Sequence, residues 1–253
     1  MNERTITVKD LKINYKIFGQ GRPLLILHGW GSKSDRWEKT AELLAEKDFF
    51  VVVPDLPGFG KSETLKEAWG MDNYVEWVKE FSESFLELNN DFILLGHSFG
   101  GAISVKFAIK YAQKVSKLFL FGAATVRKRT IKKQVLGNIS KFVKIFSFLP
   151  FYALARKAFY KFVVGSYDYI KTEGVMKETF LKATENLSEH LSFVKIPTVI
   201  IWGDKDETTP LEEAHLIHKK IENSKLEIIE GGDHNAEYKL PEIFSQKVLE
   251  HVQ

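Results

Sequence analysis

The sequence predicts an α/β fold with a mostly parallel sheet and helices on both of its faces. Two observations support this prediction: short apolar runs alternate with longer segments of helical period, and most of the runs contain no polar residue. Strands that are covered on both faces have such continuous apolar runs. The length of 253 residues, with 44% hydrophobic and 27% charged residues, suits one large domain or one domain with an insertion.

The first two strands differ from the others. Residues 5–8 and 11–17 alternate apolar with polar side chains, and only Lys9 and Asp10 separate them. Alternation predicts strands with one wet face, and a two-residue connection predicts an antiparallel hairpin. We therefore expect a hairpin at one edge of the sheet.

The remaining strands and helices alternate along the chain. Six apolar runs are expected as strands, which gives a sheet of eight strands: residues 24–27, 49–53, 92–95, 118–121, 198–202 and 226–229. Five segments have apolar residues at three- and four-residue spacing and are expected as amphipathic helices: residues 34–46, 72–88, 100–111, 211–222 and 241–251.

The alternation stops over residues 123–191, where the pattern is helical and no run bounded by turns resembles a strand. Pro150 and Gly165 divide this segment into several short helices. We expect a core formed by residues 1–122 and 192–253, interrupted by a helical insertion.

Composition excludes several classes of protein. The chain has no cysteine, which removes disulfides, thiolate nucleophiles and cysteine-ligated metals. No apolar stretch follows Met1, and no window approaches the roughly 18 apolar residues of a spanning helix, so we expect a cytoplasmic protein without a transmembrane segment. The net charge of +3 conceals a strongly basic segment, residues 127–171, with eleven Lys and Arg against the single acid Asp168.

A serine lies where an expected strand meets an expected helix. Gly-His-Ser-Phe-Gly occupies residues 96–100, directly after the apolar run 92–95. Small residues at either side allow a tight turn that lifts the hydroxyl of Ser98 above the sheet, and the following helix directs its free amides toward negative charge. The alternative is a glycine-rich turn that only joins strand to helix.

A serine nucleophile requires a base and a group that orients the base. Of seven histidines, His234 stands out because it lies in a glycine-containing loop after the run 226–229, where catalytic groups of open α/β sheets gather. The acid is expected after the strand 198–202. Three carboxylates follow that strand, and spacing does not choose among them: Asp204, Asp206 and Glu207.

Five segments resemble motifs of the α/β-hydrolase superfamily, in the same order, and the resemblance extends over essentially the whole chain. They are the oxyanion loop (27–31), Asp-x-x-Gly-x-Gly-x-Ser (55–62), the nucleophile elbow (96–101), Gly-x-x-Asp-x-x-x-Pro (203–210) and the histidine loop with its closing helix (232–244). The resemblance implies the α/β-hydrolase fold. It also implies that residues 123–191 form a helical cap, or lid.

The same resemblance implies the site. Ser98 would be the nucleophile, His234 the base and Asp206 the acid, with Asp204 as a neighbour. The backbone N–H groups of Trp30 and Phe99 would form the oxyanion hole. No cofactor and no metal site is implied.

The implied activity is that of a serine esterase of the carboxylesterase type, which cleaves small to medium acyl esters through an acyl-enzyme. Residues 28–31 and 55–62 are also similar to those of pimeloyl-acyl-carrier-protein methyl ester esterases, although Gly-His-Ser-Phe-Gly departs from the Gly-Trp-Ser-Leu-Gly of that group. A thioesterase, a lipase, a C–C bond hydrolase or a non-enzymatic ligand receptor that keeps the triad remains open.

The expected partner is a small-molecule ester substrate. The basic segment either faces an anionic carrier or an anionic lipid surface, or only solubilises short helices. Nucleic acid is not expected, because no binding motif is present and the rest of the chain is acidic. His215 and His218, three residues apart on an expected helix, suit a solvated surface better than a metal site.

Overall fold

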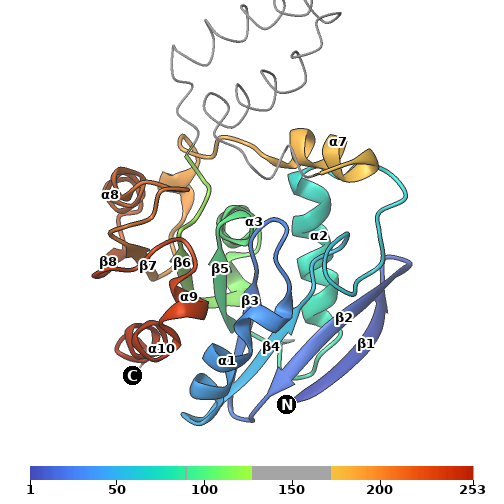
Figure 1. Cartoon of the computed structure of the whole chain (residues 1–253), viewed down its shortest axis with the longest axis horizontal. Helices are drawn as coiled ribbons and strands as arrows, with labels where there is room; N and C mark the ends of the chain where they lie inside the picture. The colour runs from blue at the N-terminus through green and yellow to red at the C-terminus, as the bar shows by residue number, and fades with distance from the viewer. Residues whose placement is uncertain (89, 127–171, 253) are drawn as a thin grey trace, which may run out of the picture.

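The computed structural model describes residues 1–88, 90–126 and 172–252. An eight-stranded sheet forms its centre, in the order β1-β2-β4-β3-β5-β6-β7-β8 (Figure 1). The strands are β1 Asn2–Val8, β2 Leu11–Phe18, β3 Arg22–Leu27, β4 Phe49–Pro54, β5 Phe92–His97, β6 Val115–Phe121, β7 Thr198–Gly203 and β8 Ser224–Ile229. The predicted α/β class and the eight strands are confirmed.

The hairpin prediction is also confirmed. β1 pairs antiparallel with β2, and β2 pairs antiparallel with β4, while every other pairing in the sheet is parallel. Lys9 and Asp10 both have positive φ, 50° and 58°. Two central residues with positive φ match the right-handed twist of the flanking strands.

The helices follow the predicted order with shifted ends. They are η1 Ser34–Trp37, α1 Glu38–Ala45, α2 Met71–Glu83, α3 Phe99–Lys110, η2 Ala112–Lys114, α7 Gly174–Ala183, η5 Leu191–Phe193, α8 Leu211–Lys220, α9 Ala236–Lys239 and α10 Pro241–Leu249. The helix predicted for residues 72–88 ends at Glu83. There the hydroxyls of Ser82 and Ser84 bond to carbonyls of the preceding turn and so compete with the helix.

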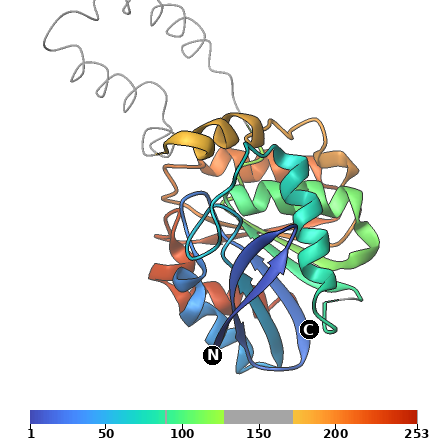
Figure 2. The same cartoon turned by 90° about the vertical axis from the view of Figure 1, so that its right-hand side faces the viewer.

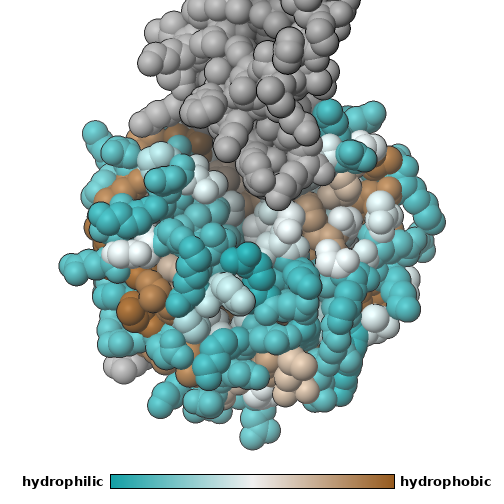
Figure 3. Space-filling view, viewed as in Figure 1, coloured by the Kyte–Doolittle hydropathy of each residue, from teal (hydrophilic) through white to brown (hydrophobic). Residues whose placement is uncertain are grey.

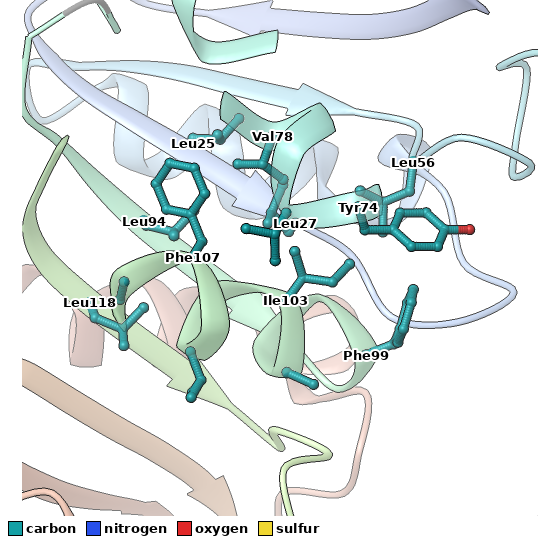
Figure 4. Packing of buried hydrophobic residues seen from close by; sticks show 14 of the residues in the cluster. Leu25, Leu27, Leu56, Tyr74, Val78, Leu94, Phe99, Ile103, Phe107 and Leu118 are labelled. Carbon is teal, nitrogen blue, oxygen red and sulfur yellow. The ribbon is translucent and has the colours of Figure 1, made fainter. Parts of the chain in front are cut away.

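The sheet separates two hydrophobic cores. Alternate residues of each central strand point to opposite faces, so Leu25 and Leu27 pack with α2 and α3, whereas Leu24 and Ile26 pack with α1 and α10. Figure 4 shows the first core, in which Leu94 and Leu118 lie against Phe107 of α3. The burial of both faces explains why the central strands are apolar throughout.

The described part of the predicted insertion includes α7. This helix lies at the N-terminal end of α2, where the Trp69 N–H donates to the Thr179 hydroxyl at 3.1 Å (Figures 1 and 2). Residues 127–171, which include the basic segment, lie outside the described residues. The boundaries of the cap therefore stay a prediction.

Hydrophilic residues predominate on the face shown in Figure 3. None of the helices that the structure describes is long and apolar enough to span a bilayer.

Candidate active site

The predicted site residues lie at one edge of the sheet. β3, β5, β7 and β8 run parallel, so their C-terminal ends meet at the same edge. Trp30 follows β3, Ser98 follows β5, Asp206 follows β7 and His234 follows β8. This edge is where open α/β sheets place their ligands.

Ser98 adopts a strained conformation between β5 and α3. Its φ of 51° and ψ of −114° are unusual for a residue with a side chain. The Ser98 N–H donates to the Phe121 carbonyl at 3.0 Å, and the Ser98 carbonyl accepts from the Ala124 N–H at 3.0 Å. A Cβ on Gly100 would lie 2.1 Å from the Leu27 carbonyl oxygen, so glycine allows α3 to approach β3 closely.

His234 and Asp206 form a hydrogen-bonded pair. Nδ1 of His234 lies 2.7 Å from Oδ2 of Asp206, and because a carboxylate only accepts, Nδ1 carries the proton. In the described part of the chain, both hydrogen-bond contacts of this ring are at Nδ1. Nε2 is therefore the nitrogen that can accept a proton from a serine hydroxyl.

The structure distinguishes among the three carboxylates that follow β7. Asp206 is 6% exposed and contacts His234, whereas Asp204 accepts a hydrogen bond from the Gly231 N–H at 2.7 Å. Glu207 is exposed to solvent. The carboxylate beside His234 is thus Asp206, the one that the resemblance indicated.

Sequence reasoning missed Thr209, which binds the same carboxylate. Oδ1 of Asp206 accepts the N–H groups of Thr208 and Thr209, each at 2.8 Å, and Oδ2 accepts the Thr209 hydroxyl at 2.8 Å. These bonds satisfy the charged carboxylate and fix its orientation. The positions of Thr208 and Thr209 could have indicated these bonds, because an aspartate commonly accepts hydrogen bonds from the N–H groups two and three residues further on.

The expected oxyanion donors lie beside Ser98. Phe99 is the first residue of α3, so its N–H belongs to the helix end that has no intrahelical acceptor. Trp30 lies in the loop after β3, and its ring centroid is 5.1 Å from that of Phe99. A Cβ on Gly29, the residue before Trp30, would lie 3.1 Å from the Cβ of Ser98, so this loop passes close to Ser98.

His28 braces the loop that contains Trp30. The Leu56 N–H donates to Nε2 of His28 at 2.9 Å, so the proton is on Nδ1, which donates to the Gly29 carbonyl at 2.8 Å. Burial lowers the pKa of His28, which favours the neutral ring that this pair of bonds requires. The imidazole thus connects the loop after β3 to the loop after β4.

Asp55 braces the other end of the same loop. Its side chain is 1% exposed and accepts the Ser34 N–H at 2.6 Å, the Asn14 amide at 3.0 Å and the Lys61 N–H at 2.8 Å. A buried carboxylate with three donors is well satisfied. The motif at residues 55–62 therefore has a structural role in this chain.

Aromatic rings line the region beside the expected oxyanion donors. The Trp30 ring meets Phe59, Phe99 and Phe180 edge to face, with centroids 4.8, 5.1 and 4.9 Å away. Its indole N–H donates to the Thr172 hydroxyl at 3.3 Å. The Phe99 ring also packs against Tyr74 (Figure 4).

The two histidines of helix α8 lie at the surface. His215 and His218 are exposed, and His218 Nδ1 lies 2.9 Å from the Ser224 hydroxyl. Among the residues that the structure describes, no group of three or more His, Asp or Glu side chains could hold a metal ion.

Comparisons with known proteins agree with the fold. A family model described as the alpha/beta hydrolase fold matches residues 22–155. Lipase 1 of Psychrobacter immobilis is 30% identical over 236 residues, which cover 85% of this chain and 71% of the lipase. Human monoacylglycerol lipase ABHD6 is 24% identical over 283 residues, which cover 99% of this chain and 82% of the lipase. The structure of a thermophilic esterase from Thermogutta terrifontis superposes with a TM-score of 0.75 at 21% identity, covering 99% of this chain and 97% of the esterase.

Proposed function

Because the chain belongs to the family of the alpha/beta hydrolase fold, we propose that it is a serine hydrolase that cleaves carboxylic esters of small to medium acyl groups. The observation that carries the proposal is the hydrogen bond between His234 and Asp206 at the sheet edge where Ser98 forms a strained turn. Relatives named lipase and monoacylglycerol lipase support hydrolase chemistry.

The proposed reaction begins at Ser98. Its hydroxyl oxygen attacks the ester carbonyl while Nε2 of His234 takes the proton, and Asp206 holds the ring in the required tautomer and stabilises the imidazolium. The imidazolium then protonates the departing alcohol, which leaves an acyl-enzyme. A water molecule, deprotonated by His234, releases the acid and restores the serine.

The N–H groups of Trp30 and Phe99 stabilise the oxyanion in this proposal. Each such donor is worth about 3 kcal/mol of transition-state stabilisation. The hydrogen bonds of His28 and Asp55 support the proposal, because they fix the loop that contains the Trp30 N–H. The aromatic rings around Trp30 would receive the apolar part of the substrate.

The experiment is the hydrolysis of a chain-length series of p-nitrophenyl esters by the wild type, Ser98→Ala and Ser84→Ala. Ser84 is an exposed serine at the end of α2 and serves as the matched control. We expect turnover that is lost in Ser98→Ala and kept in Ser84→Ala, with the length profile reporting the size of the acyl pocket. Turnover that is absent from the wild type, or unchanged in Ser98→Ala, would contradict the proposal.

Lipase activity is the second candidate, favoured by the names of two relatives and by the basic segment at residues 127–171. A lipase would prefer long acyl chains and would gain activity at an anionic lipid surface. Hydrolysis of a long-chain glyceride, with and without anionic vesicles, separates the two candidates. In the lipase case, residues 123–191 would act as the lid.

A further inference from the structure

His97 lies between the proposed nucleophile and the core beneath it. It is the last residue of β5, directly before Ser98, and is 4% exposed. Its ring stacks on Phe121 with centroids 4.9 Å apart, and Trp37 meets it at 6.0 Å. The imidazole of His234 also lies beside the His97 ring, with the two centroids 4.8 Å apart.

One hydrogen bond joins this side chain to the main chain of His234. Nε2 of His97 lies 2.8 Å from the His234 carbonyl oxygen. A carbonyl only accepts, so Nε2 of His97 must carry a proton and donate. Among the residues that the structure describes, Nδ1 of His97 is buried without a hydrogen-bond partner, and burial lowers the pKa of His97 well below its usual value. The ring is therefore a neutral donor with a fixed tautomer.

Contacts of its ring and of its carbonyl hold His234 in place. The residue lies in the loop between β8 and α9, so no ladder of sheet or helix holds its main chain. Asp206 and Thr209 contact its ring, whereas His97 binds its carbonyl. Because His97 precedes Ser98 directly, one side chain connects the backbone of the proposed base to that of the proposed nucleophile.

We propose that His97 is a positioning residue that holds the His234 carbonyl, and thereby keeps the His234 ring on Asp206 and its Nε2 toward Ser98. The inference rests on the proposed function for its effect on turnover. The hydrogen bond between His234 and Asp206 supplies a readout that does not require turnover.

The decisive variant is His97→Phe, which keeps a ring on Phe121 but has no donor. His97→Gln places an amide N–H where Nε2 stood and is the conservative rescue. His215→Phe makes the same change at an exposed histidine of α8 and is the control. His97→Leu replaces His97→Phe if the phenylalanine variant does not fold, as judged by circular dichroism.

Two measurements are made on each variant: ester turnover across pH, and the NMR resonance of the Nδ1 proton of His234. For His97→Phe we expect kcat to fall about tenfold to a hundredfold, with KM nearly unchanged, because small displacements of a catalytic group cost about that much. The NMR resonance of the Nδ1 proton of His234 should shift. His97→Gln should restore most of the kcat and most of the wild-type resonance of His234, and His215→Phe should match the wild type in both.

The possible outcomes distinguish the proposed function from the positioning role of His97. If the wild type shows no turnover but the His234 signal shifts in His97→Phe and returns in His97→Gln, the proposed function fails and the positioning role stands. If kcat and the His234 signal are both unchanged in a folded His97→Phe, the positioning role is wrong. In the wild type itself, ¹⁵N spectra should show His97 as the neutral Nε2–H tautomer, and an Nδ1–H tautomer would overturn the inference.

Discussion

Gly122 lies against the imidazole of His234: a Cβ on Gly122 would stand 3.0 Å from Nδ1 of His234. The same Cβ would lie 3.2 Å from Oδ2 of Asp206. Gly122 follows β6 directly and has a φ of +49°. The hydrogen-bonded pair therefore rests on a position that has no room for a side chain.

Gly122→Ala should displace the pair and lower kcat by about tenfold or more, since catalytic geometry tolerates little movement. The control is Gly174→Ala, at the start of α7, where φ is +54° and a Cβ would meet nothing within 4 Å. Both variants carry the strain of a left-handed residue, about 1–2 kcal/mol. Steady-state kinetics alongside thermal unfolding checks the prediction, and equal loss of activity in the two variants would contradict it.

Asp206→Asn should lower kcat by about 10⁴-fold. The asparagine oxygen is needed by the N–H donors of Thr208 and Thr209, which leaves the amide N–H facing Nδ1 of His234 and favours the wrong tautomer. Asp204→Asn is the matched control, because its remaining oxygen can still accept from Gly231. A large loss in the Asp204 variant, with Asp206→Asn active, would show that the acid has been assigned to the wrong residue.

Thr209→Val should lower kcat by about tenfold, because it removes the hydroxyl that contacts the Asp206 carboxylate, the His234 ring and the Gly122 carbonyl, while keeping the shape of the side chain. Thr209→Ser keeps the hydroxyl and should retain most activity. The comparison of kcat between the two variants isolates the contribution of the hydroxyl. Equal activities would mean that the two main-chain donors alone orient Asp206.

Glu237 should make the protein less stable as pH rises. Its side chain is fully buried in α9, and burial raises its pKa to about 8 from an ordinary value of 4.5. Between these two values the folded state retains a proton that the unfolded state releases, so the free energy of unfolding falls with increasing pH. Below pH 4.5 both states are protonated and the effect vanishes.

Glu237→Gln removes this dependence. In urea unfolding at pH 4.5, 6.5 and 8.5, the variant should gain stability relative to the wild type as pH rises. Glu87→Gln, at an exposed glutamate, should show no such trend. A difference between Glu237→Gln and the wild type that is the same at all three pH values would contradict the raised pKa.

The sequence predicts most of the fold because periodicity is a local property. The alternation of residues 11–17 identified a strand, although its expected exposed face is wrong, because only Lys12 of β2 is exposed; the continuous run at 49–53 identified a buried strand. The helix α9 escaped prediction because Ala236–Lys239 is too short to show a period. The sequence pattern extends α2 to residue 88, beyond its actual end at Glu83, because that end depends on serine hydroxyls that bond to the preceding turn.

The site was less accessible to sequence reasoning. Spacing alone left Asp204, Asp206 and Glu207 equivalent, because the direction of each side chain depends on the turn after β7. The bond from His97 to the His234 carbonyl joins residues 137 positions apart, so no local pattern contains it. Contacts of this kind depend on the parallel direction of β5, β6, β7 and β8, which places the C-terminal ends of β5 and β8 on the same side of the sheet.

The reactivity of Ser98 is the central claim, and covalent labelling tests it most directly. The wild type is treated with a fluorophosphonate, the modified peptide is identified by mass spectrometry, and the labelling rate is compared with those of Ser98→Ala and Asp206→Asn. We expect stoichiometric labelling at Ser98 in the wild type, none in Ser98→Ala and slow labelling in Asp206→Asn. An unlabelled wild type, or a label on another serine, would contradict it.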